Sequence, residues 1–199
     1  MEEMNLNFIK VDWNKFGEFV DRLYQNLKKY LDENNVKIDA IVPILREGGF
    51  TGLALAYKLN TWKVIPAHYK YRLYDGGYEL EKKAELPKIL YDLPNNPVFL
   101  LVDTWPCEGT TSIAVAKDLK SSFPNCKIIS ANLFCDTDHF PINHEIFEKV
   151  IFGLHMDMFG KYSKEEASKL GIDTNMYLFP WQSEQEESAG PLQKEYKYN

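Results

Sequence analysis

Two short apolar runs, each followed by a turn that opens a helix, constrain the fold of this chain most. They occupy residues 38–45 (IDAIVPIL) and 98–102 (VFLLV). A run this short and this continuously apolar is typical of a strand buried on both faces, since a strand with one exposed face alternates apolar and polar residues. Both runs therefore predict strands of a mainly parallel sheet that helices cover.

Helical and strand patterns alternate along the rest of the chain. Apolar residues recur at helical spacing from Asp12, which is placed as an N-cap, to about Asn34, and this predicts an amphipathic helix. Further helices are predicted at residues 53–59 and 111–122, and further strands at residues 62–65, 127–134 and 150–152. The polar, glycine-broken stretch 69–83 predicts a mobile loop or a loose hairpin. The alternation predicts βαβ units and an α/β fold.

Length and composition favour one folded unit. The chain has 199 residues, of which 45% are hydrophobic and 26% are charged, which is enough to bury a core. We expect one domain over residues 1–182 and a polar C-terminal tail over residues 183–199. The formal net charge of -6 provides no global attraction to nucleic acid or to an anionic membrane. Neither is an expected partner, and an anionic ligand needs a local site.

Cysteine usage and the N-terminus indicate the compartment. The three cysteines, Cys107, Cys126 and Cys135, form no CxxC pair, and an odd number without a secretory segment argues for a reducing environment. Residues 1–10 carry acids and amides where a signal peptide needs a basic region and an apolar run. We therefore expect a cytoplasmic protein.

The residues after the second apolar run have the chemistry of a ligand site. Asp103 stands at the strand end, and Gly109 with the hydroxyl run Thr110, Thr111 and Ser112 opens the next helix. The free N–H groups and the positive dipole end of such a helix suit a phosphate, and the carboxylate suits sugar hydroxyls. By spacing alone, an ordinary capped helix after a glycine turn accounts for the pattern equally well.

Three segments resemble the type I phosphoribosyltransferases. VFLLVDTWPCEGTTS (98–112) is similar to the family's signature for phosphoribosyl pyrophosphate, and IVPILREGGFTGLALAYKL (41–59) is similar to its first strand, pyrophosphate loop and helix. NMYLFPWQ (175–182) resembles the purine-type members, notably the xanthine-guanine and hypoxanthine group. The resemblance spans about residues 38–182 and implies a mainly parallel sheet flanked by helices, with a flexible lid and a small C-terminal hood segment.

The resemblance also implies roles for individual residues. The catalytic set would be Asp103, Cys107 and Arg46. The 5-phosphate would be held by Glu108, Gly109, Thr110, Thr111 and Ser112. Pyrophosphate would face Arg46, Glu47 and Gly48, in a loop that often carries a cis peptide bond in the family. The nucleobase would be held by Met176, Tyr177 and Trp181, and the lid would carry Lys70 and Arg72.

The implied reaction transfers the phosphoribosyl group from phosphoribosyl pyrophosphate to a nucleobase, more specifically a purine. The implied cofactor is Mg2+ held by substrate oxygens and water, so no dedicated protein cage is expected. The family also implies a homodimer.

Four features depart from the family pattern. A lysine that the resemblance implies near Phe134 and Cys135, to bind a 6-oxo group of the base, is missing, and the other three are substitutions. Thr104 replaces a second acidic residue, Cys107 stands where purine-type members have an aspartate near the base, and Glu108 stands where a threonine touches phosphate. A non-catalytic sensor or regulator that binds a nucleotide or phosphoribosyl pyrophosphate is therefore the main alternative. An unrelated phosphate-binding α/β enzyme is a third possibility.

One further cluster has a simpler explanation. The segment 136–144 contains four side chains of the kinds that bind metal ions, namely Asp136, Asp138, His139 and His144. It has no pair of them at helical i, i+4 spacing, and it contains Pro141. A solvated loop is the expected structure there, and no metal-binding residues are assigned.

Overall fold

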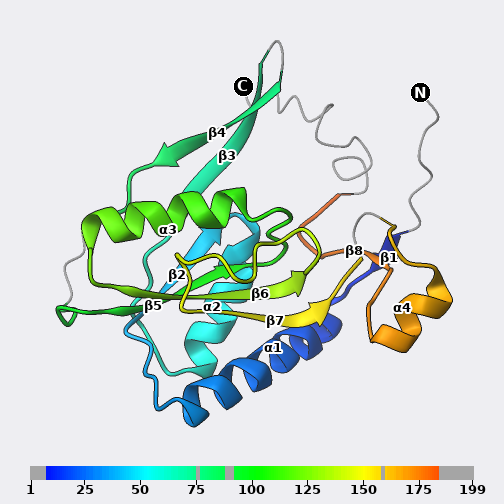
Figure 1. Cartoon of the computed structure of the whole chain (residues 1–199), viewed down its shortest axis with the longest axis horizontal. Coiled ribbons are helices and arrows are strands. Elements are labelled where there is room, and N and C mark those ends of the chain that lie inside the picture. Colours follow the sequence, from blue (N-terminus) through cyan, green and yellow to red (C-terminus); the bar gives the residue numbers. More distant parts are fainter. Residues whose placement is uncertain (1–7, 75–76, 88–91, 158–159, 184–199) are drawn as a thin grey trace.

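A six-stranded sheet with the order β4-β3-β2-β5-β6-β7 forms the centre of the molecule (Figure 1). The computed structural model describes residues 8–74, 77–87, 92–157 and 160–183, with the backbone alone at 72–74 and 77–78. The strands are β2 (Ala40–Leu45), β3 (Ala67–Tyr74), β4 (Gly77–Ala84), β5 (Val98–Asp103), β6 (Lys127–Cys135) and β7 (Lys149–His155). Only β3 and β4 are antiparallel within this sheet. The predicted mainly parallel α/β fold is confirmed.

The helices cover both faces of the sheet. They are α1 (Trp13–Glu33), α2 (Glu47–Lys58), α3 (Thr110–Ser122) and α4 (Lys164–Leu170). Figure 1 shows α1 and α2 on one face and α3 on the other. A separate two-stranded parallel sheet joins β1 (Phe8–Lys10) to β8 (Met176–Leu178).

Two hydrophobic cores lie on opposite faces of the sheet. In β5, Leu100 and Val102 face the core that contains α1, whereas Phe99 and Leu101 face the core that contains α3. All four side chains are essentially inaccessible to solvent, because successive side chains of a strand point to opposite faces and both faces are covered. This double burial explains the continuous apolar run in the sequence.

The first helix follows the sequence expectation closely. Asp12 caps α1, and its side chain accepts a hydrogen bond from Lys15 N at 2.7 Å. The helix buries one apolar stripe, namely Phe16, Phe19, Val20, Leu23, Leu27 and Leu31. It ends at the C-cap Asn34, the residue at which the pattern predicts its end.

Two predicted boundaries are wrong. Residues 62–65 form no strand but a single bridge between Val64 and Ile41, and the strand beside β2 is β3. The helix predicted over 53–59 begins at Glu47, so the glycine-containing turn expected at 46–49 is largely the first helical turn. Glycine disfavours helices in general, but here Gly48 allows the helix to lie against β5. A Cβ atom on Gly48 would be 2.5 Å from Val102 O.

The stretch 69–83 forms a hairpin of β3 and β4 rather than a mobile loop. The base of this hairpin is anchored to α3: Tyr69 donates a hydrogen bond from its hydroxyl to Asp118, and Lys82 Nζ lies 2.7 Å from Asp118 Oδ2. Lys70, one of the two predicted lid residues, lies on β3. The side chain of Arg72, the other one, is outside the part of the chain that the structure describes.

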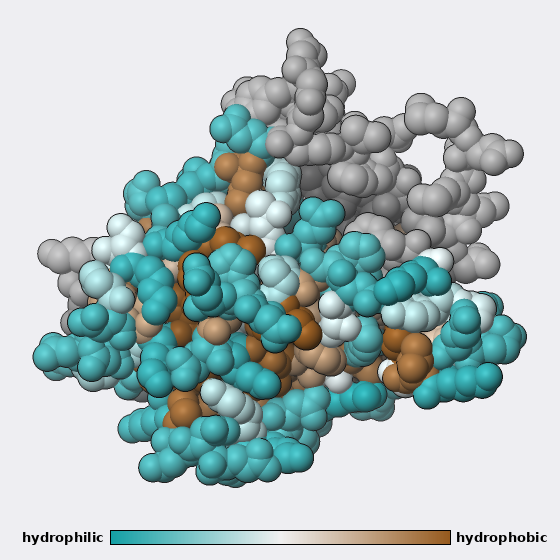
Figure 2. Space-filling model, in the orientation of Figure 1, coloured by the Kyte–Doolittle hydropathy of each residue, from teal (hydrophilic) through white to brown (hydrophobic). Residues whose placement is uncertain are grey.

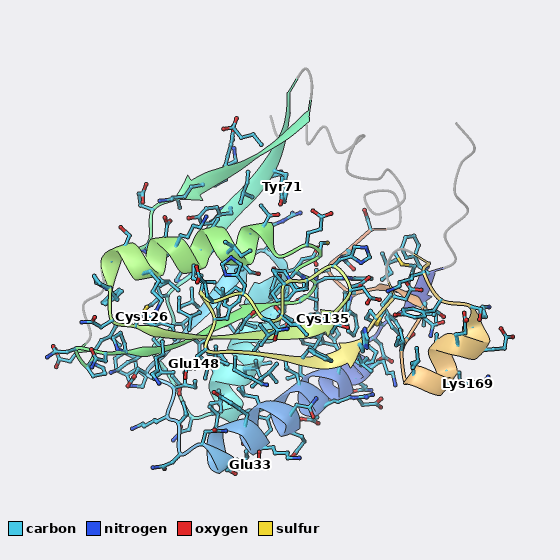
Figure 3. All side chains as sticks on the ribbon, viewed as in Figure 1. Glu33, Tyr71, Cys126, Cys135, Glu148 and Lys169 are labelled. Atoms are coloured by element: carbon cyan, nitrogen blue, oxygen red, sulfur yellow. The ribbon has the colours of Figure 1, made fainter. Side chains whose placement is uncertain are left out.

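The described surface is mostly polar, and the expected cytoplasmic location stays a prediction. The face in Figure 2 is mostly hydrophilic, with apolar residues in small separate patches. Within the described ranges, no helix has the length and apolar character needed to cross a membrane. All three cysteines are free, and Figure 3 shows Cys126 and Cys135 at opposite ends of β6. Residues 184–199, most of the predicted tail, are outside the described ranges, so that domain boundary stays a prediction.

Candidate functional site

The site lies where the direction of the chain connections changes in the sheet. From β2 the chain passes through α2 to β3 on one side, whereas β5 and β6 extend the sheet on the other side. In open α/β sheets, ligands bind at this switch point, in the crevice at the carboxyl ends of the two central strands. The carboxyl ends of β2 and β5 carry the predicted pyrophosphate and phosphate loops, so the fold brings these two segments together.

Thr104 joins the two loops. Its side chain is fully buried, donates a hydrogen bond to Glu47 O at 3.0 Å and lies 2.9 Å from Thr51 Oγ1. A second carboxylate at this position would be buried against a backbone carbonyl with no positive partner in these contacts, which is unfavourable. A threonine therefore fits this buried position through its two side-chain contacts.

Asp103 stands at the carboxyl end of β5. Its Oδ1 accepts a hydrogen bond from Thr104 N at 2.8 Å. Burial, and then the nearby charge of Glu47, raises the pKa of Asp103 to about 7. Both causes disfavour the carboxylate form, so a cation or a hydrogen-bond donor from a ligand would stabilise the charged side chain.

The predicted phosphate loop has a left-handed residue directly before α3. Gly109 has φ of 76°, and a Cβ atom on it would be 2.9 Å from the ring of Phe140. After it, Thr110 is exposed, Thr111 is partly buried and Ser112 is buried. Ser112 Oγ has no hydrogen-bond partner among the described residues. The start of α3 thus combines free N–H groups with hydroxyl groups, which suits a phosphate.

Cys107 and Glu108 form the outer part of this loop, and both are exposed. Desolvation of the thiol within the loop, followed by the neighbouring charge of Asp103 and other carboxylates, raises the pKa of Cys107 to about 12. This upward shift favours the protonated thiol, which is a weaker nucleophile than the thiolate. Its catalytic assignment stays a prediction. Glu108 is exposed to solvent, so its carboxylate is not enclosed by the loop.

Arg46 precedes α2 and is exposed. The peptide bond between Leu45 and Arg46 is cis, as the resemblance implies for this loop. Glu47 and Gly48 follow in the first helical turn, so the three residues of the predicted pyrophosphate loop lie together beside the end of β5.

The three predicted base-binding residues lie in or beside β8, at the edge of the core that contains α1. Tyr177 is buried, packs on Phe134 and donates a hydrogen bond to Asp173 Oδ2 at 2.7 Å. Trp181 stacks on Phe50 with ring centroids 4.2 Å apart. Met176 is partly exposed. Tyr177 and Trp181 therefore make structural contacts already, and their base-binding role stays a prediction.

The position of Tyr177 permits a specific test. Tyr177→Phe keeps the ring but leaves Asp173 without this donor, so we expect the free energy of unfolding to fall by about 1 kcal/mol. The affinity for guanosine monophosphate should not change, because the Tyr177 hydroxyl already donates its hydrogen bond to Asp173. Denaturant unfolding and calorimetric titration measure the two quantities. A nucleotide affinity more than fivefold weaker in the variant would show that the hydroxyl contacts the ligand directly.

Asp103 and Glu47 are the side chains that would contribute to a magnesium site. Within the described part of the chain, no group of three or more histidine, cysteine, aspartate or glutamate side chains could hold a metal ion. The two carboxylates supply hard oxygen donors whose mutual repulsion a cation would relieve. The residues present therefore fit Mg2+ that a substrate brings with it, with most ligands coming from substrate and water.

Comparisons with known proteins identify the fold. No protein-family model matches the chain, and no curated protein sequence does. Among solved structures, a xanthine-guanine-hypoxanthine phosphoribosyltransferase from Helicobacter pylori matches with a TM-score of 0.59 and 18% identity over 91% of this chain and 97% of that chain. A purine phosphoribosyltransferase from Pyrococcus horikoshii matches with a TM-score of 0.55 and 16% identity, covering 89% of this chain and 96% of that chain. The chain has the type I phosphoribosyltransferase fold.

A third similar structure has a bound ligand. It is a hypothetical protein from Neisseria gonorrhoeae with bound ppGpp, at a TM-score of 0.61 and 15% identity, covering 92% of this chain and 94% of that chain. At these identities the likeness establishes the fold and leaves the activity open.

Sequence reasoning missed several residues that shape this site. Thr51, Phe140 and Gln182 contact the predicted loops through buried or long-range contacts. Thr51 and Gln182 lie within two of the segments that carry the resemblance. No local pattern indicates the contacts of the three residues, because each is far in sequence from the residue that it contacts.

Proposed function

We propose that this protein transfers the phosphoribosyl group from phosphoribosyl pyrophosphate to a purine base. One observation carries the proposal: the close approach of Gly48 to Val102 places the first turn of α2 against the end of β5, next to Asp103. Two helix N-termini therefore begin at adjacent strand ends with a carboxylate between them. This arrangement matches a ligand with a phosphate, a ribose and a pyrophosphate.

In this proposal the chain's own residues bind and orient the ligand. The backbone N–H groups at the start of α3 hold the 5-phosphate, Asp103 accepts hydrogen bonds from the ribose hydroxyls, and Arg46 faces the pyrophosphate. Bound Mg2+ would neutralise part of the negative charge of the pyrophosphate leaving group. The C1′–O bond to pyrophosphate breaks, a bond from a base nitrogen to C1′ forms, and the proton of that nitrogen passes to the released pyrophosphate, so no protein nucleophile is needed. Positioning and electrostatic stabilisation carry the rate enhancement.

Nucleotide binding without turnover is the second candidate function. The protonated thiol of Cys107 supplies no proton acceptor beside the base, and the structurally similar Neisseria protein holds ppGpp. In that case the same loops bind a phosphorylated nucleotide as a regulatory ligand.

A binding and turnover panel separates the two functions. Phosphoribosyl pyrophosphate, guanosine monophosphate and ppGpp, each with Mg2+, are tested for an increase in melting temperature, since a ligand at a hundredfold excess over its Kd stabilises by about 2.7 kcal/mol. Release of pyrophosphate in the presence of guanine, hypoxanthine, xanthine or adenine reports turnover. Binding without release supports the regulator, and no binding of any phosphorylated ribose contradicts both functions.

Asp103→Asn provides the specific control in this panel. The amide loses a charge-assisted acceptor worth about 1.5 to 3 kcal/mol, so we expect ligand affinity to fall at least tenfold. Asp92→Asn is the matched substitution, because Asp92 is exposed and lies outside the site. If both variants bind as the wild type does, Asp103 does not hold the ribose.

Glu108→Thr tests the phosphate loop. A carboxylate about 5 Å from a phosphate charge is repelled by roughly 3 kcal/mol at an effective dielectric of 20. Because Glu108 is exposed, only residual repulsion remains, and we expect the variant to bind phosphoribosyl pyrophosphate more tightly by about 1 kcal/mol. Calorimetric titration at low and moderate salt checks this. Weaker binding by the variant would mean that Glu108 makes a positive contact with the ligand.

A further inference from the structure

The first turn of α2 contacts the C-terminal hood, which we define as residues 176–182, through two side-chain pairs. Gln182 Nε2 donates to Glu47 Oε1 at 3.2 Å, and the Trp181 ring stacks on Phe50 at 4.2 Å. We propose that Gln182 is a positioning residue that holds the Glu47 carboxylate and couples the hood to the pyrophosphate loop. The positioning role of Gln182 does not depend on the proposed function. Only the choice of pyrophosphate as the ligand that would use the coupling rests on it.

The orientation of the Gln182 amide is fixed by the backbone of the hood. Phe179 N donates to Gln182 Oε1 at 2.9 Å, and Gln182 N donates to Phe179 O at 2.9 Å. A backbone N–H can only donate, so it identifies the oxygen of the amide and leaves the NH2 group for Glu47. The side chain is therefore held in place before any ligand binds, as a positioning group requires.

The other end of the link reaches the ribose side of the site. Glu47 O accepts the hydrogen bond of the Thr104 hydroxyl, and Thr104 N donates to the Asp103 carboxylate. Contacts thus run without a gap from Phe179 through Gln182 and Glu47 to the end of β5. Magnesium pyrophosphate at the loop would bring a cation to the Glu47 carboxylate, and a carboxylate held in place by both the cation and Gln182 would hold Gln182 more firmly. Ligand binding at the loop would in this way change the hood.

Glutamine is suited to this role because it is a neutral donor. An arginine or lysine would neutralise Glu47 and compete with a metal ion for it, whereas a carboxylate would repel it. A neutral amide holds the side chain and leaves its charge unchanged. The second pair, Phe50 and Trp181, keeps the two segments in contact without any charge.

Amide hydrogen exchange of the ligand-free protein tests the link directly. Each variant is assessed at the segment on the other side of the contact, which we call its crossed readout. For Gln182→Ala these are the amides of residues 49–52, and for Glu47→Ala they are the amides of Phe179 and Gln182. We expect each to exchange about tenfold faster than in the wild type, and the double variant to exchange no faster than the faster single variant. Unchanged exchange in both crossed readouts would overturn the proposal.

Two further variants separate the link from general loosening. Gln182→Glu keeps an oxygen for Phe179 N but places a second carboxylate against Glu47, so exchange at residues 49–52 should rise with little change at Phe179. Gln25→Ala is the matched control, since Gln25 is exposed on α1, and it should change neither segment. Equal loosening in Gln25→Ala would also overturn the proposal.

A ligand arm measures the coupling. Magnesium pyrophosphate at saturation should slow exchange at Phe179 and Gln182 at least threefold in the wild type. It should not do so in Gln182→Ala, although we expect calorimetry to show that this variant still binds. Equal slowing in both proteins would contradict the coupling. If the wild type does not bind magnesium pyrophosphate, the proposed function fails at this loop, and the ligand-free comparison still decides whether the link exists.

Discussion

Replacing Gly48 with alanine is expected to lower the free energy of unfolding by about 3 kcal/mol, the upper part of the range for overpacked sites. The added Cβ would lie 2.5 Å from Val102 O and 3.2 Å from Asp103 Cα. Both are backbone atoms of the central strand β5, so neither can turn away as a flexible side chain would. Relief requires α2 to move off the sheet, which also separates the two proposed phosphate-binding loops.

Gly17→Ala on α1 is the matched substitution. A Cβ atom at Gly17 meets nothing within 4 Å, and alanine is the better helix former by about 0.5 to 1 kcal/mol. The same change of residue should therefore stabilise one helix and destabilise the other. Urea unfolding of the two variants measures both values. A loss below about 1 kcal/mol at Gly48 would show that α2 is not held against β5 as described.

Asp103→Asn is expected to raise stability at pH 8 by up to about 4 kcal/mol while weakening ligand binding. The pKa of Asp103 is raised to about 7 by burial and by the charge of Glu47, whereas an aspartate in an unfolded chain has a pKa of about 3.9. Between these values the folded state binds more protons than the unfolded state. The contribution of Asp103 to stability is therefore lost as the pH rises from about 4 to about 7, and an amide removes this loss.

Thermal unfolding of both proteins from pH 5 to pH 8 measures the effect. We expect the difference in melting temperature at pH 5 to be about a third of that at pH 8, because the effect accumulates between the unfolded and folded pKa values of Asp103. The variant should at the same time bind phosphoribosyl pyrophosphate more weakly, since stability and function make opposite demands on this residue. A pH-independent difference would mean that the carboxylate is solvated in the folded protein.

The sequence predicts those parts of the fold whose signal is local. The helix beginning at Asp12 has a cap and a continuous apolar stripe, and β2, β5 and β6 are apolar because two cores cover them. Their existence and type are read correctly from residue periodicity. The boundary of α2 is read wrongly, because glycines at positions 48 and 49 usually indicate a turn and here provide space for packing against β5.

Other elements could not be predicted for physical reasons. β1 and β8 contain three residues each and exist through their pairing with one another, so neither has a pattern of its own. α4 has a capping box from Ser163 to Glu166 and ends at Gly171, signals that are present but belong to a helix of only seven residues. In the site, the loops are visible in the sequence, whereas the contacts of Thr104 and Gln182 depend on the tertiary fold.

The pairing of β1 with β8 has a consequence for the order in which parts of the fold form during synthesis. Phe8 lies beside Met176 in this parallel pair, so the first strand has no partner until almost the whole described chain has left the ribosome. The six-stranded sheet can assemble earlier, because its strands end at His155. The hood should therefore close last, after the strands of the six-stranded sheet have been synthesised, and a chain truncated before β8 should keep the sheet but leave the edge of β1 unpaired.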